Sequence, residues 1–300
     1  MCLICMKRKL VRQGSSTMMI SLPSKWIKAN KLDKGSEVDL EEENNRLVIG
    51  TETKGKLETS INLPSLAESL IRVLIVNSYR EGYDKIIVHL SDEKQFKILQ
   101  EIIKTKLIGF DIIKKEKSSC TVENVTEPSI NQFDNILGKL FDNILELIEI
   151  TKQKLESKKP EENFEETEDR IQKYDNFCRR VINKQNSNKK SEFLIFLTQI
   201  NHAQREVYHL NKMSTGKHEK IAGLLNETKE LFNLITKSYK EKNPEILAKI
   251  HELEKEILYK KGYLALEKSK GKESIIIYHI LSSIRNLYLS SSPLSILIMS

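Results

Sequence analysis

The N-terminal part of the chain alternates short apolar runs with turn-forming residues. A turn at Gly14-Ser15-Ser16 separates two runs of strand-forming residues, and a polar turn at 42–45 separates two more. The predicted strands are residues 8–12, 17–22, 37–41 and 46–49. Between the hairpins, Pro23 favours the first turn of a helix, so a two-turn helix is predicted over 23–30.

This N-terminal unit, residues 7–50, is too small to bury a core of its own, because chains of below roughly 50 residues are marginal without metal, disulfide or oligomerisation. The apolar set expected in a shared core is Leu10, Met18, Ile20, Leu22, Trp26, Ile27, Leu32, Val38, Leu40, Leu47 and Ile49. We therefore expect two chains to share these side chains in a homodimer.

Over residues 56–126 the sequence pattern alternates between strand-forming and helix-forming segments, which predicts a small α/β domain. The expected order is strand, helix, strand, helix, strand, strand, with the helices covering one face of the sheet. The predicted strands are 56–63, 85–90, 110–114 and 121–125, and the predicted helices are 66–79 and 93–104. No glycine-rich phosphate loop follows any of these strands, so we expect a packing or partner-contact role.

From about residue 128 onward, apolar residues recur every three or four positions, which is the helical period. The predicted helices are about 129–157, 163–186, 191–213, 217–241, 244–268 and 272–291. We interpret residues 128–291 as an all-α bundle of two three-helix repeats. The fold class is therefore multidomain: a β-rich N-terminal unit, an α/β middle domain and a helical bundle.

The distribution of charge adds a functional indication. The formal net charge is +7, but residues 1–31 contain seven Lys or Arg and no Asp or Glu, whereas later segments mix both signs. A basic excess favours polyanion partners. The alternative is an ordinary solvated basic surface.

The cysteines and the chain ends indicate a cytoplasmic protein that does not insert into a membrane. Cys2 and Cys5 form a CxxC, but no second pair lies at zinc-ribbon spacing, and their role stays open. No signal peptide is expected, because the basic residues follow the short apolar stretch 1–6 instead of preceding it. The apolar run 294–299 is far shorter than a membrane span.

The stretch from Arg8 to Ile49 resembles a known family through Gly14-Ser15-Ser16, Ser21-Leu22-Pro23-Ser24-Lys25-Trp26, Leu32, Lys34-Gly35 and Glu37-Val38. It is similar to the AbrB/SpoVT-type swapped-hairpin DNA-binding domain, in the version that precedes archaeal PhoU-like proteins. The resemblance implies an intertwined homodimer that lays a basic hairpin surface on double-stranded DNA.

By their position on the first hairpin, its turn and the following helix, nine residues are the candidate DNA contacts. They are Arg8, Lys9, Arg12, Gln13, Ser15, Ser16, Thr17, Lys25 and Lys28. Lys and Arg would bind phosphates and supply most of the affinity, while a few side chains would read base edges or groove shape. Trp26 is expected in the core.

The helical region resembles PhoU, a phosphate-signalling regulator whose two three-helix halves carry acidic metal-binding motifs. Asn201 and Arg205 stand where the family's acidic pair would lie, and residues 281–286 are no closer to that motif. No cofactor is therefore expected from the resemblance, although a metal ion is kept open. The resemblance implies a sensor or docking module in the control of phosphate uptake.

One candidate metal site comes from spacing alone. His202, Glu206 and His209 share one helical face, and the E-x-x-H spacing occurs in carboxylate-bridged metal bundles. Glu168, Asp169 or Asp175 would complete it. A solvated polar helix face explains the same pattern.

Together these patterns predict a transcriptional regulator. No hydrolase, zinc-protease, Walker or dinucleotide motif is present, so an enzyme is not expected. The first alternative is a protein-interaction adaptor that docks on a transporter or a signalling protein such as a kinase, with the N-terminal unit serving only dimerisation. The second alternative is an antitoxin-like protein.

Overall fold

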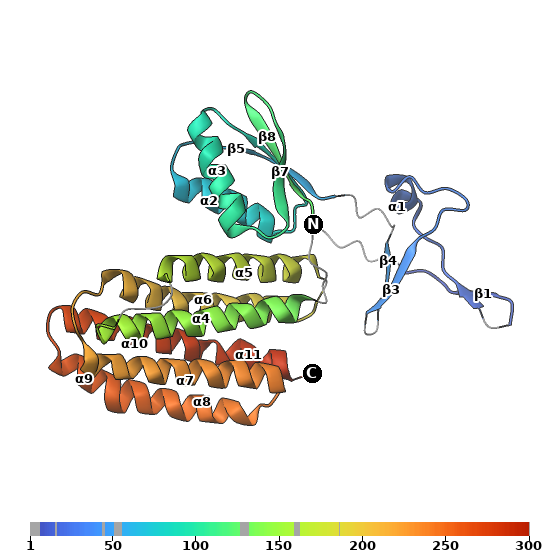
Figure 1. Ribbon diagram of the computed structural model, residues 1–300. Helices are drawn as coiled ribbons and strands as arrows, with labels where there is room; N and C mark the ends of the chain where they lie inside the picture. Colours follow the sequence, from blue (N-terminus) through green and yellow to red (C-terminus); the bar gives the residue numbers. More distant parts are fainter. Residues whose placement is uncertain are drawn as a thin grey trace. The chain divides into compact units, whose positions relative to one another are not determined.

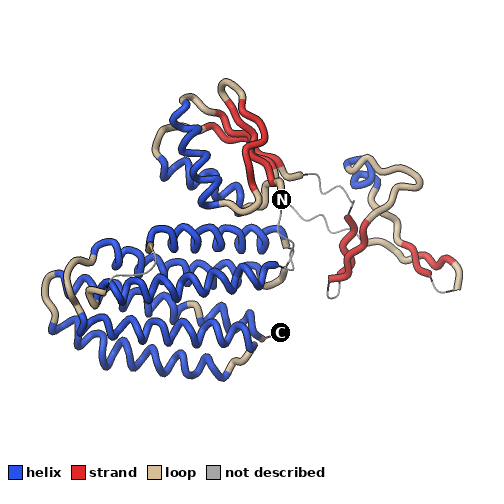
Figure 2. The backbone as a smooth tube through the Cα atoms, in the orientation of Figure 1, coloured by secondary structure: helices blue, strands red, loops and turns tan. Residues whose placement is uncertain are grey.

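The computed structural model describes residues 7–15, 17–43, 46–50, 56–126, 132–158, 163–185 and 187–299. The chain divides into two compact units, residues 1–56 and 57–300. Figure 2 shows strands and one short helix in the first unit, and a sheet with many helices in the second.

The N-terminal unit consists of two antiparallel hairpins and a short helix (Figure 1). Its elements are β1 (Val11–Gln13), β2 (Thr17–Met19), α1 (Ser24–Ala29), β3 (Asp39–Glu43) and β4 (Arg46–Gly50). These elements follow the predicted order, with a shorter first hairpin than the sequence suggests. The observed helix starts one residue after Pro23, whose φ of −65° suits a helix start.

The sheet of the second unit has four strands in the order β5-β6-β8-β7, with β5 and β6 parallel and the other pairs antiparallel. Its elements are β5 (Glu58–Asn62), α2 (Glu68–Arg80), β6 (Lys85–His89), α3 (Glu93–Lys106), β7 (Phe110–Lys115) and β8 (Ser119–Asn124). This is the predicted sequence of strands and helices. Two helices connect the first three strands, and a tight hairpin adds the last one.

Both helices cover the same face of this sheet (Figure 1). Along β6 and β8, buried residues alternate with partly exposed ones, so Ile86, Val88, Cys120 and Val122 point to one side. These four side chains belong to the same apolar cluster as residues of α2 and α3. The opposite face is polar, with contacts such as Lys85 to Glu58 at 3.0 Å.

The remaining chain forms a helical bundle. Its helices are α4 (Phe133–Leu155), α5 (Phe164–Lys184), α6 (Lys190–Met213), α7 (Glu219–Glu241), α8 (Glu245–Lys255), α9 (Tyr263–Lys268), α10 (Lys272–Leu289) and α11 (Ser291–Ile298). A π-helical segment, Glu256–Gly262, joins α8 to α9 within the predicted fifth helix. Sequence periodicity ended the last helix at 291, whereas α11 adds a further segment whose Leu294, Leu297 and Ile298 are buried. Across the described part of the chain, every helix is too short or too polar to span a lipid bilayer.

The bundle comprises a first half, α4 to α6, and a second half, α7 to α11, and the repeat of two three-helix units stays a prediction. Helices α4, α5 and α6 pack on one another, α7 packs on α8 and α10, and the halves meet where α6 packs on α10 and α4 on α7. In the first half, Arg205 donates to Glu168 at 2.6 Å and lies 4.6 Å from the centre of the Tyr208 ring. The second half repeats this arrangement with Arg285, Glu254 and Tyr288, at 2.7 Å and 5.4 Å.

The α/β layer packs on the bundle through α2 and α3, which contact α5. Arg180 of α5 is buried in this contact and donates to the backbone oxygens of Tyr79 and Tyr83 and to the Asp84 carboxylate. Asn183 also donates to the Arg80 backbone oxygen at 2.7 Å. The two parts of this unit are therefore held together by buried polar contacts in addition to apolar packing.

Gly109 tightens the edge of the sheet next to this contact. Its φ is +79°, and its carbonyl oxygen accepts hydrogen bonds from the backbone N–H groups of Val125 and Thr126. A Cβ at this position would overlap the Thr126 carbonyl oxygen. We expect Gly109→Ala to lower the free energy of unfolding by about 2 to 4 kcal/mol, because left-handed strain and overpacking add.

Gly138 is the matched control for this prediction. It lies inside α4, where an added Cβ would meet nothing within 4 Å. Gly138→Ala should therefore leave stability unchanged or raise it by about 0.5 to 1 kcal/mol, because Ala is the better helix former. Urea unfolding followed by far-ultraviolet circular dichroism measures both variants, and equal stabilities would contradict the role of Gly109.

Candidate nucleic-acid interface

The first hairpin presents the predicted DNA contacts. In the β1–β2 ladder, Arg12 lies opposite Met18 and Gln13 opposite Thr17. Gly14 has a φ of +78°, a left-handed turn conformation that glycine adopts without steric cost. The Arg12 guanidinium donates to the Ser15 carbonyl oxygen at 2.9 Å, so this side chain bends over the turn.

The structure leaves the candidate contacts that it describes open to solvent. Arg8 and Lys9 precede β1, Ser15 lies in the turn, and these residues are exposed together with Arg12, Gln13 and Thr17. Ser16 lies outside the described residues. The hairpin thus gathers three cations within five residues, and no Asp or Glu precedes residue 33.

The remaining two candidates lie on α1. Lys25 and Lys28 are exposed and lie one helical turn apart, whereas Trp26 and Ile27 of the same helix are partly buried. Trp26 therefore lies on the inner side of this helix, although not in a closed core. These two lysines lie on α1 and not on the first hairpin. A DNA-binding surface that includes them would therefore be formed by both the first hairpin and α1.

Many apolar residues of the N-terminal unit remain exposed in a single chain. Among its described residues none is buried, and the exposed large apolar side chains range from 43% to 66% of their full accessible area. These exposed residues are Leu10, Val11, Met18, Met19, Ile20, Leu40 and Leu47. Such a set needs a partner surface, because leaving it in water forgoes the main driving force for folding.

The residues of the candidate metal site have other contacts. Glu206 is hydrogen-bonded to His279 of α10 at 2.6 Å, His209 lies 3.3 Å from an Arg205 nitrogen, and His202 is exposed. Partial burial and the Arg205 charge both lower the pKa of His209. No three His, Cys, Asp or Glu side chains in the described ranges gather where a metal ion could be held.

The acidic residues considered as further ligands are also engaged. Glu168 is paired with Arg205, Asp169 with Lys106, and Asp175 with both Arg80 and Arg179. The metal site therefore stays a prediction that gains no support from this geometry.

The structure also contains a polar pocket that sequence reasoning missed. It lies between the α/β layer and the bundle, and residues from α2, α3, α5 and α6 line it. The sequence contains only a weak indication of this pocket, because the charged residues that line it have the spacing of an ordinary solvent-exposed helix face. Only the packing of α2 and α3 on α5 brings them together.

The comparison with known proteins concerns the first unit. Residues 11–57 match the family model described as antidote-toxin recognition MazE, bacterial antitoxin. This match supports an N-terminal domain of the swapped-hairpin DNA-binding type and is consistent with dimerisation; it describes a regulatory protein and not an enzyme. No curated protein and no solved structure matches the chain.

Proposed function

We propose that this protein is a DNA-binding transcriptional regulator that works as a homodimer. Its N-terminal hairpin unit binds double-stranded DNA, and its PhoU-like helical bundle serves as a sensor or partner-docking module. We propose that the chain has three domains, at residues 7–50, 56–126 and 128–291.

One observation carries this proposal. The N-terminal unit combines an exposed, acid-free basic hairpin with apolar side chains that a single chain leaves uncovered, and residues 11–57 of the chain match a family of DNA-binding antitoxin type. The uncovered apolar residues favour a dimer, and the cations favour a polyanion. A duplex supplies regularly spaced phosphates to both copies of the hairpin.

The chemistry of such a site is mainly electrostatic. Arg8, Lys9 and Arg12 would neutralise phosphates and release counterions, which makes the affinity fall steeply with salt. Gln13 and Thr17, side by side at the hairpin tip, have the hydrogen-bonding groups that read base edges. Lys25 and Lys28 would add phosphate contacts from α1.

The proposed process is the control of phosphate uptake or related transport, with a transporter or a signalling protein as a further partner of the bundle. This part rests on the resemblance of the bundle to PhoU and on the Arg–Glu–Tyr contact that recurs in its two halves. Control of DNA binding requires an effector or partner whose affinity differs between two states of the protein.

The test is fluorescence anisotropy of labelled duplex DNA, titrated with the full chain and with a chain that lacks residues 1–50, at several salt concentrations. We expect tight, salt-sensitive binding by the full chain and none by the truncated chain. Binding by neither chain would favour the protein-interaction adaptor instead. Equal binding by both would move the DNA site into the second unit.

The family match favours an antitoxin as the second candidate, because its description names toxin recognition. An antitoxin of this type would also bind DNA, so the anisotropy experiment does not separate the two. A small toxin gene beside this one, whose product binds the purified chain and loses its toxicity, would decide for the antitoxin.

A further inference from the structure

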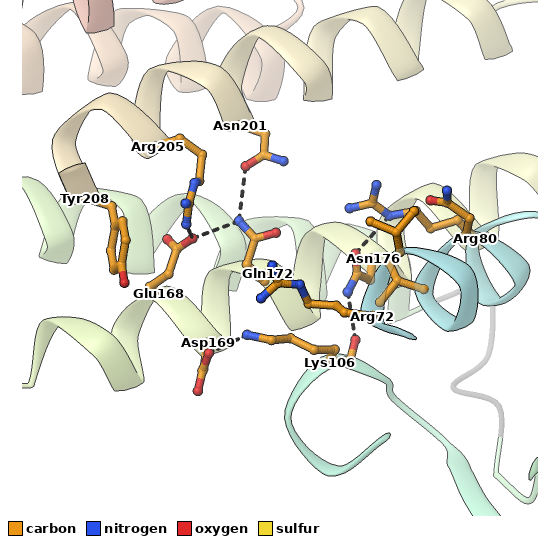
Figure 3. A pocket seen from close by; sticks show the side chains of 13 residues that line it. Arg72, Arg80, Lys106, Glu168, Asp169, Gln172, Asn176, Asn201, Arg205 and Tyr208 are labelled. Atoms are coloured by element: carbon orange, nitrogen blue, oxygen red, sulfur yellow. Dashed lines mark hydrogen bonds and ion pairs between the residues drawn. The ribbon is translucent and has the colours of Figure 1, made fainter. Parts of the chain in front are cut away.

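A pocket of about 450 Å³ lies where the α/β layer meets the bundle. Figure 3 shows its walls: α2 contributes Arg72 and Arg80, the end of α3 contributes Lys106, and α5 and α6 contribute the remaining labelled side chains. We call it the joint pocket. All its residues belong to the second unit, whereas the proposed DNA site lies in the first.

Four cations and two carboxylates line the joint pocket. Each of these cations has a carboxylate partner, although the partners Glu68 and Asp175 lie outside the lining. The pairs are Arg72 with Glu68, Arg80 with Asp175, Lys106 with Asp169, and Arg205 with Glu168. Because these partners offset the charge of the cations, the pocket can present both a carboxylate and a guanidinium to one ligand, which fits a molecule that carries both charges.

Glu168 supplies the acceptor for the positive part of such a ligand. Its Oε1 accepts from Arg205 at 2.6 Å and from Gln172 at 3.0 Å. Its Oε2 is buried, has no hydrogen-bond partner among the described residues, and belongs to a residue that is only 4% exposed. A buried carboxylate oxygen without a donor is costly, and an ammonium group in the pocket would satisfy it.

The electrostatics of Glu168 agree with this assignment. Burial raises its pKa, and the hydrogen bond and charge of Arg205 only partly offset this effect. The carboxylate is therefore less stabilised by its surroundings than an ordinary surface carboxylate, and a second positive group beside it would be favourable.

Arg72 supplies the donor for the negative part. Its only described ion pair is with Glu68 at 3.5 Å on the same helix, and the two side chains are 45% and 63% exposed. Pairs of this kind contribute little, so the guanidinium can turn to a ligand at small cost. A carboxylate can then accept two parallel hydrogen bonds from it.

We propose that the joint pocket binds a small zwitterion of the α-amino acid type, with its ammonium on Glu168 and its carboxylate on Arg72. Val73 and Val76 line the same pocket and give its side chain an apolar wall. Since Arg72 lies on α2 and Glu168 on α5, the ligand would link the α/β layer to the bundle. The inference goes beyond the proposed DNA binding and does not depend on it.

The experiment starts with thermal unfolding of the full chain in the presence of each standard L-amino acid at about 5 mM. At least one should raise the melting temperature by about 2 to 4 °C, because a ligand of the native state stabilises it by mass action. The decarboxylated amine and the deaminated acid of that amino acid should each bind at least about 10-fold more weakly, since each lacks one of the two charges.

Variants then test the two residues by calorimetric titration with the same amino acid. We expect Arg72→Gln and Glu168→Gln each to weaken binding at least about 10-fold. Glu254→Gln is the matched control, because Glu254 forms the equivalent buried pair with Arg285 in the second half of the bundle, away from the pocket. It should bind like the unchanged chain.

Three results would overturn the proposal: no amino acid stabilises the chain, the amine or the acid binds as tightly as the amino acid, or Arg72→Gln leaves the affinity unchanged. Arg72 is half exposed, so this variant tests the pocket even if Glu168→Gln fails to fold. No step uses DNA, so failure here leaves the proposed DNA binding standing.

Discussion

Changing Arg8, Lys9 and Arg12 together to Ala in the full chain is expected to weaken binding to duplex DNA by at least about 100-fold at moderate salt. These residues are three exposed cations on and before the first strand of the hairpin. A dimer carrying the triple change loses six of them. If each contacts a phosphate, the slope of log affinity against log salt should become shallower by about 5.

The change should affect DNA binding and not dimerisation. Polar side chains that face solvent contribute little to a shared apolar core, so sedimentation should give the same dimer for the variant and for the unchanged chain. Anisotropy over a range of salt concentrations measures both the affinity and the slope. Unchanged affinity would remove these three residues from the interface.

The chain offers a matched control for the loss of charge. Lys249, Lys260 and Lys268 are exposed residues of the second half of the bundle. Changing these three to Ala removes the same charge from the chain, far from the hairpin in sequence. We expect DNA affinity to change less than about 3-fold, because these lysines are not part of the proposed DNA site and salt screens exposed charges. A loss equal to that of the hairpin variant would show that only net charge matters.

Much of the architecture could be predicted from the sequence because it depends on local patterns. The helical period predicted α4 to α7 and α10 within a few residues, and strand-forming runs separated by turns located all eight strands among the described residues. The π-helical segment Glu256–Gly262 and the final helix α11 were not predicted. Periodicity does not distinguish a local π-helical turn from an α-helix, and α11 is short and almost wholly apolar.

The candidate sites differ in how well they could be predicted from the sequence. The basic hairpin could be predicted because its cations are neighbours in the chain. The joint pocket was not, since Arg72 and Glu168 are almost a hundred residues apart and meet only when α2 packs on α5. The repeated Arg–Glu–Tyr contacts could have been found by aligning residues 200–208 with 280–288, where Arg and Tyr recur at the same spacing.

The second large effect is expected from Arg180→Met in α5. The guanidinium is buried, donates to two backbone oxygens at 3.1 and 2.8 Å and to Asp84 at 2.5 Å, and lies over the rings of Tyr79 and Phe110. Met fills similar volume but leaves two buried carbonyl oxygens without this donor. We expect a loss of about 3 to 5 kcal/mol in the free energy of unfolding.

Arg170→Met on the same helix is the control. Arg170 pairs with Glu146 at 3.1 Å and also donates to the side-chain oxygens of Asn143 and Thr167, but both charged side chains are about one-third exposed. We therefore expect a smaller loss than for Arg180→Met, about 1 to 2 kcal/mol. Urea unfolding of both variants gives the comparison. A loss below about 1 kcal/mol for Arg180→Met would mean that apolar packing alone holds the α/β layer on the bundle.

The acid dependence of Asp84 tests the same network from the other side. Burial acts to raise the pKa of Asp84, but the hydrogen bond from Lys184 and the charges of Lys184 and Arg180 outweigh it and leave the pKa lowered. The folded chain therefore binds this proton less readily than the unfolded chain does. The ionised carboxylate stabilises the fold above the unfolded-state pKa of about 3.9, and this contribution disappears as the pH falls through the folded-state value.

Asp84→Asn should consequently be less stable than the unchanged chain at pH 7, and the difference in the free energy of unfolding should shrink below a pH of about 4. A difference that stays constant over this range would mean that Asp84 holds Arg180 by its shape and hydrogen bonds, and not by its charge.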